Sequence, residues 1–175
     1  MTVCPNRLEY VEVESSDKLL PIRKEIVAWS EEGYIINSYP AILNGGVFKQ
    51  PLNKIIPKYK AIKVGVTGKV EIYVAFAYGS ENSSNYEKIL KENGWNKEDG
   101  EITFGDTSDI KLDKIFSKLV QGNLSYSYLP PTTEDIFMLV IVVSICKGRC
   151  SALIDYYRIT SVLFPIKESE IFNVI

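Results

Sequence analysis

The sequence of 175 residues contains no histidine. Histidine is the usual general base near neutral pH, and its imidazole completes Ser-His-Asp and Cys-His nucleophile arrangements and many metal sites. All of these arrangements are therefore excluded, and any catalysis would depend on carboxylates, Lys, Tyr or Cys. We predict a protein that is not an enzyme and that has no catalytic residue, cofactor or metal site.

Cysteine is also scarce, with three residues in the chain. Cys146 and Cys150 flank a short turn, and their Cα atoms would fall within disulfide range if the two residues opposed each other across a hairpin. Because only Cys4 remains and histidine is absent, the pair lacks the further ligands of a zinc site. Two reduced thiols are the alternative if the protein is intracellular.

Long apolar runs are missing as well. The longest, residues 136–143, is too short to cross a bilayer as a helix. The first 14 residues lack the basic segment followed by an apolar run that marks a secretory signal. We therefore expect a soluble, cytoplasmic protein that does not bind membranes.

Neither sign of charge dominates, because the chain has 20 Lys and Arg residues and 22 Asp and Glu residues, for a net charge of −2. A general nucleic-acid binder would usually be basic, so nucleic acid is not an expected partner. Lysine far outnumbers arginine, which is consistent with the AT-rich genome of a microbe or a virus.

Acidic residues are absent from residues 47–70, where lysines accumulate. This composition could form a local patch for phosphate or another anion. The candidates for the patch are Lys54, Lys58, Lys60 and Lys63. The alternative is a solvated edge, where lysines discourage edge-to-edge aggregation.

The most regular pattern lies at residues 60–79, where apolar and polar side chains alternate. Alternation of this length is typical of a half-buried β-hairpin, and Thr67-Gly68 would form its turn. The inner face would seed the core with Ile62, Val64, Val70, Ile72, Val74 and Phe76. The outer face would carry Tyr73, Ala75 and Ala77, which are too apolar for open water. Either this protein or a partner should cover them.

Further strands are predicted at residues 8–14, 34–39, 46–49, 101–104, 124–129, 136–146 and 152–164. Residues 136–146 are apolar on both faces, so we expect a central, fully covered strand; a buried helix is the alternative. Residues 22–29 fit either a strand or a short helix.

Two short amphipathic helices are also predicted. The first would begin after Ser83 or Ser84 and end at Asn93-Gly94. The second would occupy residues 109–121, with Leu112, Ile115, Phe116, Leu119 and Val120 on its core face. We therefore predict one α+β domain over residues 1–175, mainly an antiparallel sheet or sandwich with two short helices.

The function predicted from these observations is non-enzymatic binding or assembly through protein–protein contacts, with a partner or as a homo-oligomer. Tyrosine is common at interfaces because it buries area and keeps a polar tip. The interface candidates are Tyr73, Ala75, Ala77, Tyr126 and Tyr128.

Two alternatives remain open at the level of the sequence. An enzyme or small-ligand binder could use carboxylate and tyrosine chemistry near residues 98–109, although the acids there do not follow the EF-hand spacing and their separation for glycoside hydrolysis is undefined. A hairpin that inserts into a membrane as an oligomer is the weaker alternative.

Overall fold

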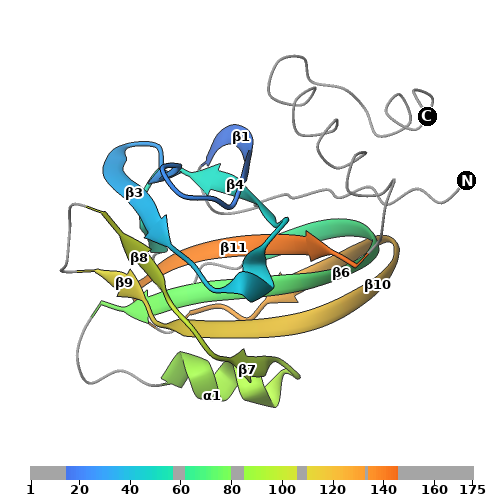
Figure 1. Cartoon of the computed structure of the whole chain (residues 1–175). Helices are drawn as coiled ribbons and strands as arrows, with labels where there is room; N and C mark the ends of the chain where they lie inside the picture. Colours follow the sequence, from blue (N-terminus) through green and yellow to red (C-terminus); the bar gives the residue numbers. More distant parts are fainter. Residues whose placement is uncertain (1–14, 57–61, 80–84, 106–109, 133, 146–175) are drawn as a thin grey trace, which may run out of the picture.

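The computed structural model describes residues 15–56, 62–79, 85–105, 110–132 and 134–145 (Figure 1). For residues 15, 17, 62–68 and 121–128 it describes the backbone. These ranges contain eleven strands, one α-helix and one short 3₁₀ helix. The fold of the described residues is therefore mainly β-sheet.

Seven strands form one antiparallel sheet in the order β1-β4-β11-β6-β10-β7, and β5 also pairs with β11. The strands are β1 (Ser15–Pro21), β4 (Val47–Pro51), β5 (Ile55–Ile56), β6 (Ile62–Tyr78), β7 (Asn96–Glu98), β10 (Lys114–Leu129) and β11 (Ile136–Ser144).

Four shorter strands form a second antiparallel sheet in the order β2-β3-β8-β9. They are β2 (Val27–Trp29), β3 (Glu32–Ser38), β8 (Ile102–Phe104) and β9 (Lys111–Leu112). The 3₁₀ helix η1 (Ala41–Leu43) follows β3, and the helix α1 (Asn85–Glu92) lies next to β7 in Figure 1.

The strand β6 runs unbroken through Thr67 and Gly68, so the hairpin predicted within residues 60–79 is wrong. Beside β11 on one side, β6 pairs on the other side with β10, from Lys114 opposite Phe76 to Leu129 opposite Ile62. The apolar residues stay on even-numbered positions through the expected turn, and this unbroken period of two suits one long strand. Gly68 lies opposite Gly122, and Figure 1 shows both strands curving together in that region.

The second predicted helix, residues 109–121, is also wrong, because this stretch forms β9 and the start of β10. Ile115 and Phe116 are both fully buried, and as neighbours on a strand they face opposite sides of the sheet. Burial on two sides outweighs the helical spacing of the apolar residues. Leu119, which the helix would have buried, is 54% exposed.

The central strands are buried on both faces, and each face belongs to a different core. The back core contains Val70, Ile72, Val74, Phe76, Phe116, Met138 and Val140, with Tyr86, Leu90 and Trp95 packed against them. The front core contains Tyr73, Ala75, Ile115, Leu139 and Ile141, with Trp29, Ile36, Ile102, Phe104 and Leu112. The prediction of a central, covered strand at residues 136–146 is confirmed by β11.

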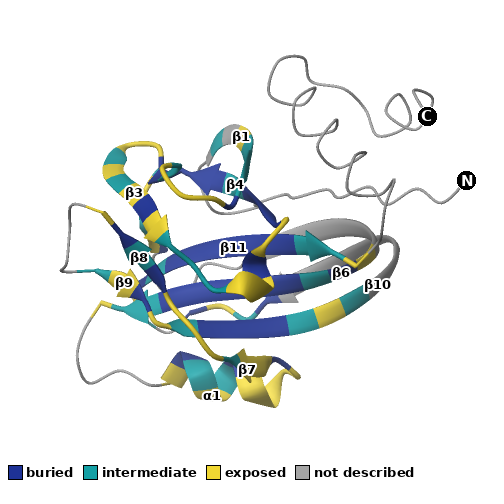
Figure 2. Cartoon of the chain, in the orientation of Figure 1, coloured by how far each residue is buried: buried dark blue, intermediate teal, exposed yellow. Residues whose placement is uncertain are grey.

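The four-stranded sheet covers the face that carries Tyr73, Ala75 and Ala77, which we call the front face of the central sheet. Tyr73 and Ala75 are buried, and Ala77 is partly buried (Figure 2). Of the two possibilities left open by the sequence, coverage by this protein itself therefore applies to Tyr73 and Ala75. Strands of the same chain provide it.

The helix α1 confirms the first predicted helix and ends as its sequence indicates. Gly94 has φ +87°, and its N–H donates to Lys91 O at 3.1 Å while Trp95 N–H donates to Leu90 O at 3.0 Å. These two bonds form a Schellman cap, in which glycine takes the left-handed conformation. The predicted N-cap, Ser83 or Ser84, lies outside the described residues.

Several other predicted strands are confirmed: residues 34–39 overlap β3, 46–49 overlap β4, 101–104 overlap β8, and 124–129 form the end of β10. Residues 22–29 contain the strand β2. The strands predicted at residues 8–14 and 152–164 lie outside the described residues. Within the described ranges, no helix is long and apolar enough to cross a membrane.

Candidate functional site

One polar cluster lies on the front face where β6, β10 and β7 meet. Tyr73 and Ser117 are register partners on β6 and β10. Tyr73 Oη donates a hydrogen bond to Glu71 Oε2, and Ser117 Oγ donates to Glu98 Oε1 at 2.7 Å. Burial and, after it, the bond to Glu71 raise the pKa of the Tyr73 phenol above its usual range. The phenol therefore stays protonated and donates its hydrogen bond to Glu71.

The acids predicted near residues 98–109 do not converge on this cluster as a set. Glu98 belongs to it, whereas Glu101 is exposed and pairs with Lys111 at 3.3 Å. Asp99 is exposed, and residues 106–109 lie outside the described ranges. Among the described residues, no three acidic or sulfur ligands are grouped to hold a metal ion.

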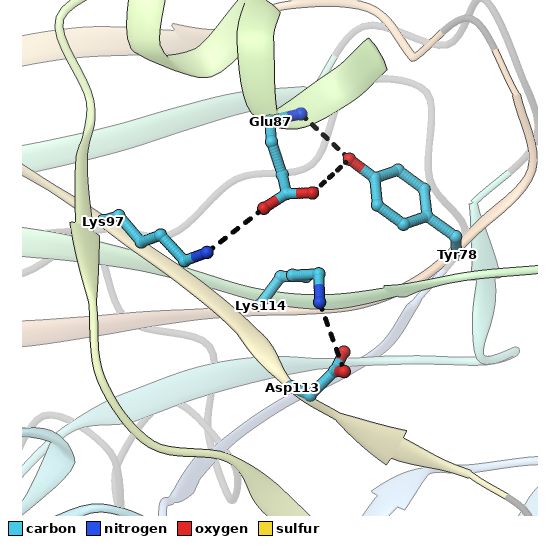
Figure 3. Close-up of polar contacts among 5 residues, drawn as sticks. All are labelled: Tyr78, Glu87, Lys97, Asp113 and Lys114. Carbon is cyan, nitrogen blue, oxygen red and sulfur yellow. Dashed lines mark hydrogen bonds and ion pairs between the residues drawn. The ribbon is translucent and has the colours of Figure 1, made fainter. Parts of the chain in front are cut away.

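A second polar network joins α1 to the sheet, as Figure 3 shows. Tyr78 Oη donates to Glu87 Oε2 at 3.2 Å and accepts the N–H of Glu87 at 3.0 Å. Lys97 Nζ lies 3.5 Å from Glu87 Oε1. Burial, more than the contacts with Glu87, raises the pKa of the Tyr78 phenol. These contacts anchor the first turn of α1, and we assign them a structural role.

Of the predicted basic patch, Lys54 is the member whose side chain the structure describes. Its Nζ lies 2.6 Å from Glu32 Oε1 and 5.0 Å from the ring centre of Tyr34. The hydrogen bond to Glu32 is the main cause that raises the pKa of Lys54. Lys54 is therefore neutralised by an acid and packed on aromatic rings.

For the remaining predicted site residues, the structure describes the backbone or nothing. Lys63 lies in β6 opposite Tyr128 of β10, and Tyr126 lies opposite Gly65. Lys58 and Lys60 lie outside the described residues, and so do Cys146 and Cys150. The basic patch and the disulfide therefore stay predictions.

The front face also has an end that the four-stranded sheet does not cover. Glu71 of β6 lies between Leu119 of β10 and Val143 of β11, in one row across the three strands. In the next row, Ile145 N–H donates to Lys69 O at 3.1 Å, which places Ile145 beside Lys69. We call these five residues the open end of the front face.

Two apolar members of the open end are exposed. Leu119 is 54% exposed and Ile145 is 39% exposed, while Val143 is partly buried. Figure 2 shows the dark blue of β11 and β10 giving way to teal and yellow toward this end. The loop that follows η1 borders it, because Gly46 packs against the side chains of Ile141 and Val143.

The helical spacing of residues 109–121 conceals this surface, because it predicts Leu119 on the core face of a helix. The available signal was strand alternation: on a strand, Leu119 shares a face with Ile115 and Ser117. No family model matches the chain, and no curated protein and no solved structure is significantly similar to it.

Proposed function

We propose that this protein is a non-enzymatic binding or assembly protein that acts through protein–protein contacts on its β-sheet scaffold. The observation that supports the proposal is the open end of the front face, where Leu119 and Ile145 expose apolar surface on the two sides of β6. Exposed apolar surface next to charged residues is typical of protein interaction sites. Lys69 and Glu71 supply the charge here.

This contact surface replaces the one expected from the sequence. Tyr73 and Ala75 are buried in the front core, so they cannot meet a partner without unfolding the four-stranded sheet. Tyr73 supports the surface instead, because it lies two residues from Glu71 on the same face of β6 and donates a hydrogen bond to it.

A photo-crosslinking experiment tests the proposal in the cells that naturally express the chain. A photoreactive phenylalanine analogue replaces Leu119 in one variant and Ile35 in the other. Ile35 is a suitable control because it is 39% exposed on β3, away from the open end. We expect a discrete crosslinked protein product from position 119 and none of the same size from position 35.

A further substitution, Ile145→Asp, places a charge inside the open end and should abolish the product from position 119. The matched variant Ile35→Asp changes the same residue type at the same exposed fraction and should leave the product intact. A chain that stays uncrosslinked at position 119 would overturn the proposal.

A further inference from the structure

We infer that the partner at the open end of the front face is a second copy of this chain, bound about a two-fold axis. The inference rests on the proposed function and names its partner. A symmetric interface uses the same patch on both copies, so every residue must face a residue that complements it. The register of β6 and β11 meets this requirement.

The open end consists of two rows across the sheet. The first row holds Leu119, Glu71 and Val143, and the second holds Lys69 and Ile145. Adjacent rows on one face are two residues apart along each strand. Glu71 of the first row and Lys69 of the second row lie two residues apart on the same strand, β6. Along the line of β11, each row has an apolar residue.

A two-fold axis that lies in the interface and crosses β6 at right angles, level with Val70, exchanges the two rows. The rotation places β6 over β6 and β11 over β11 of the second copy. Glu71 then faces Lys69 of the other copy, and Val143 faces Ile145 of the other copy. One axis thus forms two ion pairs and two apolar contacts, and this charge complementarity favours a second copy over an unrelated protein.

The arrangement requires the spacing of two packed sheets at the open end. Sheets stack face to face at about 10 Å, with strand directions within about 30° of each other. Lysine and glutamate side chains from opposed sheets can meet across that gap. Glu71 already accepts a hydrogen bond from Tyr73, and a carboxylate accepts several, so Glu71 can also receive a lysine.

Charge reversal tests this arrangement directly. Lys69→Glu sets acid against acid in both symmetric pairs, and Glu71→Lys sets base against base. We expect each variant alone to dimerise at least about tenfold more weakly than the wild type, because like charges are opposed. Light scattering after size-exclusion chromatography, run at several protein concentrations and low salt, measures the effect.

Mixing the two variants supplies the decisive result. In a heterodimer, the acid introduced at position 69 of one chain meets the base introduced at position 71 of the other. The native Glu71 and the native Lys69 form the second pair, so both pairs are restored. We expect dimers to reappear in the mixture and also in the double variant K69E/E71K. A misfolded variant would not be rescued in this way.

The control is Lys111→Glu, at an exposed strand position outside the open end, which should dimerise like the wild type. Two outcomes overturn the inference. In one, the wild type is a monomer at every concentration; in the other, its dimer is unaffected by both reversals. Neither outcome alone removes the proposed function, since a crosslink from position 119 to a different protein would still support a binding role. A monomer that also yields no crosslink would overturn both.

Discussion

At the scale of single residues, Gly94 carries the turn that ends α1. Its φ of +87° is a conformation that costs a residue with a side chain about 1–2 kcal/mol. We expect Gly94→Ala to lower the free energy of unfolding by about that amount, although no atom within 4 Å blocks the new methyl group. Urea denaturation measures the change.

Gly33→Ala is the matched control, because Gly33 also has open space around it but lies in the strand β3. There the substitution should change the free energy of unfolding by less than about 0.5 kcal/mol, as at other surface positions. Equal losses at the two glycines would show that backbone conformation is not what Gly94 provides.

Tyr86 makes the stability sensitive to alkaline pH. Its ring is fully buried, its Oη donates to Pro130 O at 2.9 Å, and burial raises its pKa well above the ordinary value. In the unfolded chain the phenol ionises near pH 10. The folded protein keeps the proton, so its stability is complete below about pH 10 and falls as pH rises further.

The expected loss at Tyr86 is about 1.4 kcal/mol for each pH unit above 10. Tyr86→Phe should weaken this dependence, while it lowers stability near neutral pH by about 1 kcal/mol through the lost hydrogen bond. Urea denaturation at pH 8 and pH 11 compares the two proteins. The same slope with and without the hydroxyl group would contradict the assignment.

At the scale of elements, β11 and β3 differ in how many faces they bury. Met138 and Leu139 are neighbours on β11, and both are buried, one in each core. On β3, Ile36 is buried and Ile35 is exposed. We expect substitution by alanine to cost about 2–5 kcal/mol at Met138, Leu139 and Ile36.

Ile35→Ala should cost less than about 0.5 kcal/mol, because its side chain faces solvent. The four variants form one series, measured by urea denaturation under the same conditions. A small loss at either Met138 or Leu139 would mean that one face of β11 is open, which would contradict the two-core arrangement.

The sequence predicted elements well where one local signal decided the structure. The run at residues 136–146, which is apolar on both faces, correctly predicted the strand β11, and Asn93-Gly94 correctly predicted the end of α1. It failed where two signals competed. The helical spacing of Leu112, Ile115 and Phe116 is genuine, but burial of neighbours on opposite faces selects a strand. Thr67-Gly68 resembles a turn, yet the alternation on both sides of it stays in phase.

At the scale of the whole molecule, strand pairing could not be derived from the sequence. One of the two partners of β6 is β10, which begins 36 residues after β6 ends, and no local pattern specifies that choice. The same limit applies to the candidate site. Leu119, Glu71 and Val143 share a row only because β10, β6 and β11 are neighbours.

The central sheet belongs to both cores, so the two cores should unfold together. The chain has two tryptophans, and each reports on a different core: Trp29 on the front core and Trp95 on the back core. Trp29 Nε1 also donates to Met138 O at 3.1 Å, which ties the four-stranded sheet to β11. Trp95 Nε1 is buried without an acceptor among the described residues.

The variants Trp29→Phe and Trp95→Phe each leave one fluorescent reporter. Trp29→Phe should lower stability by about 1–3 kcal/mol, because the carbonyl of Met138 loses its indole donor in a buried place. In each variant, urea denaturation followed by fluorescence and by far-ultraviolet circular dichroism should give coincident transitions, as expected for all-or-none unfolding. If the fluorescence of Trp29 changed at a lower urea concentration than the dichroism, the four-stranded sheet would detach first. The four-stranded sheet would then be a separable cover rather than part of one cooperative unit, and the buried candidates Tyr73 and Ala75 would become accessible to a partner in that partly unfolded state.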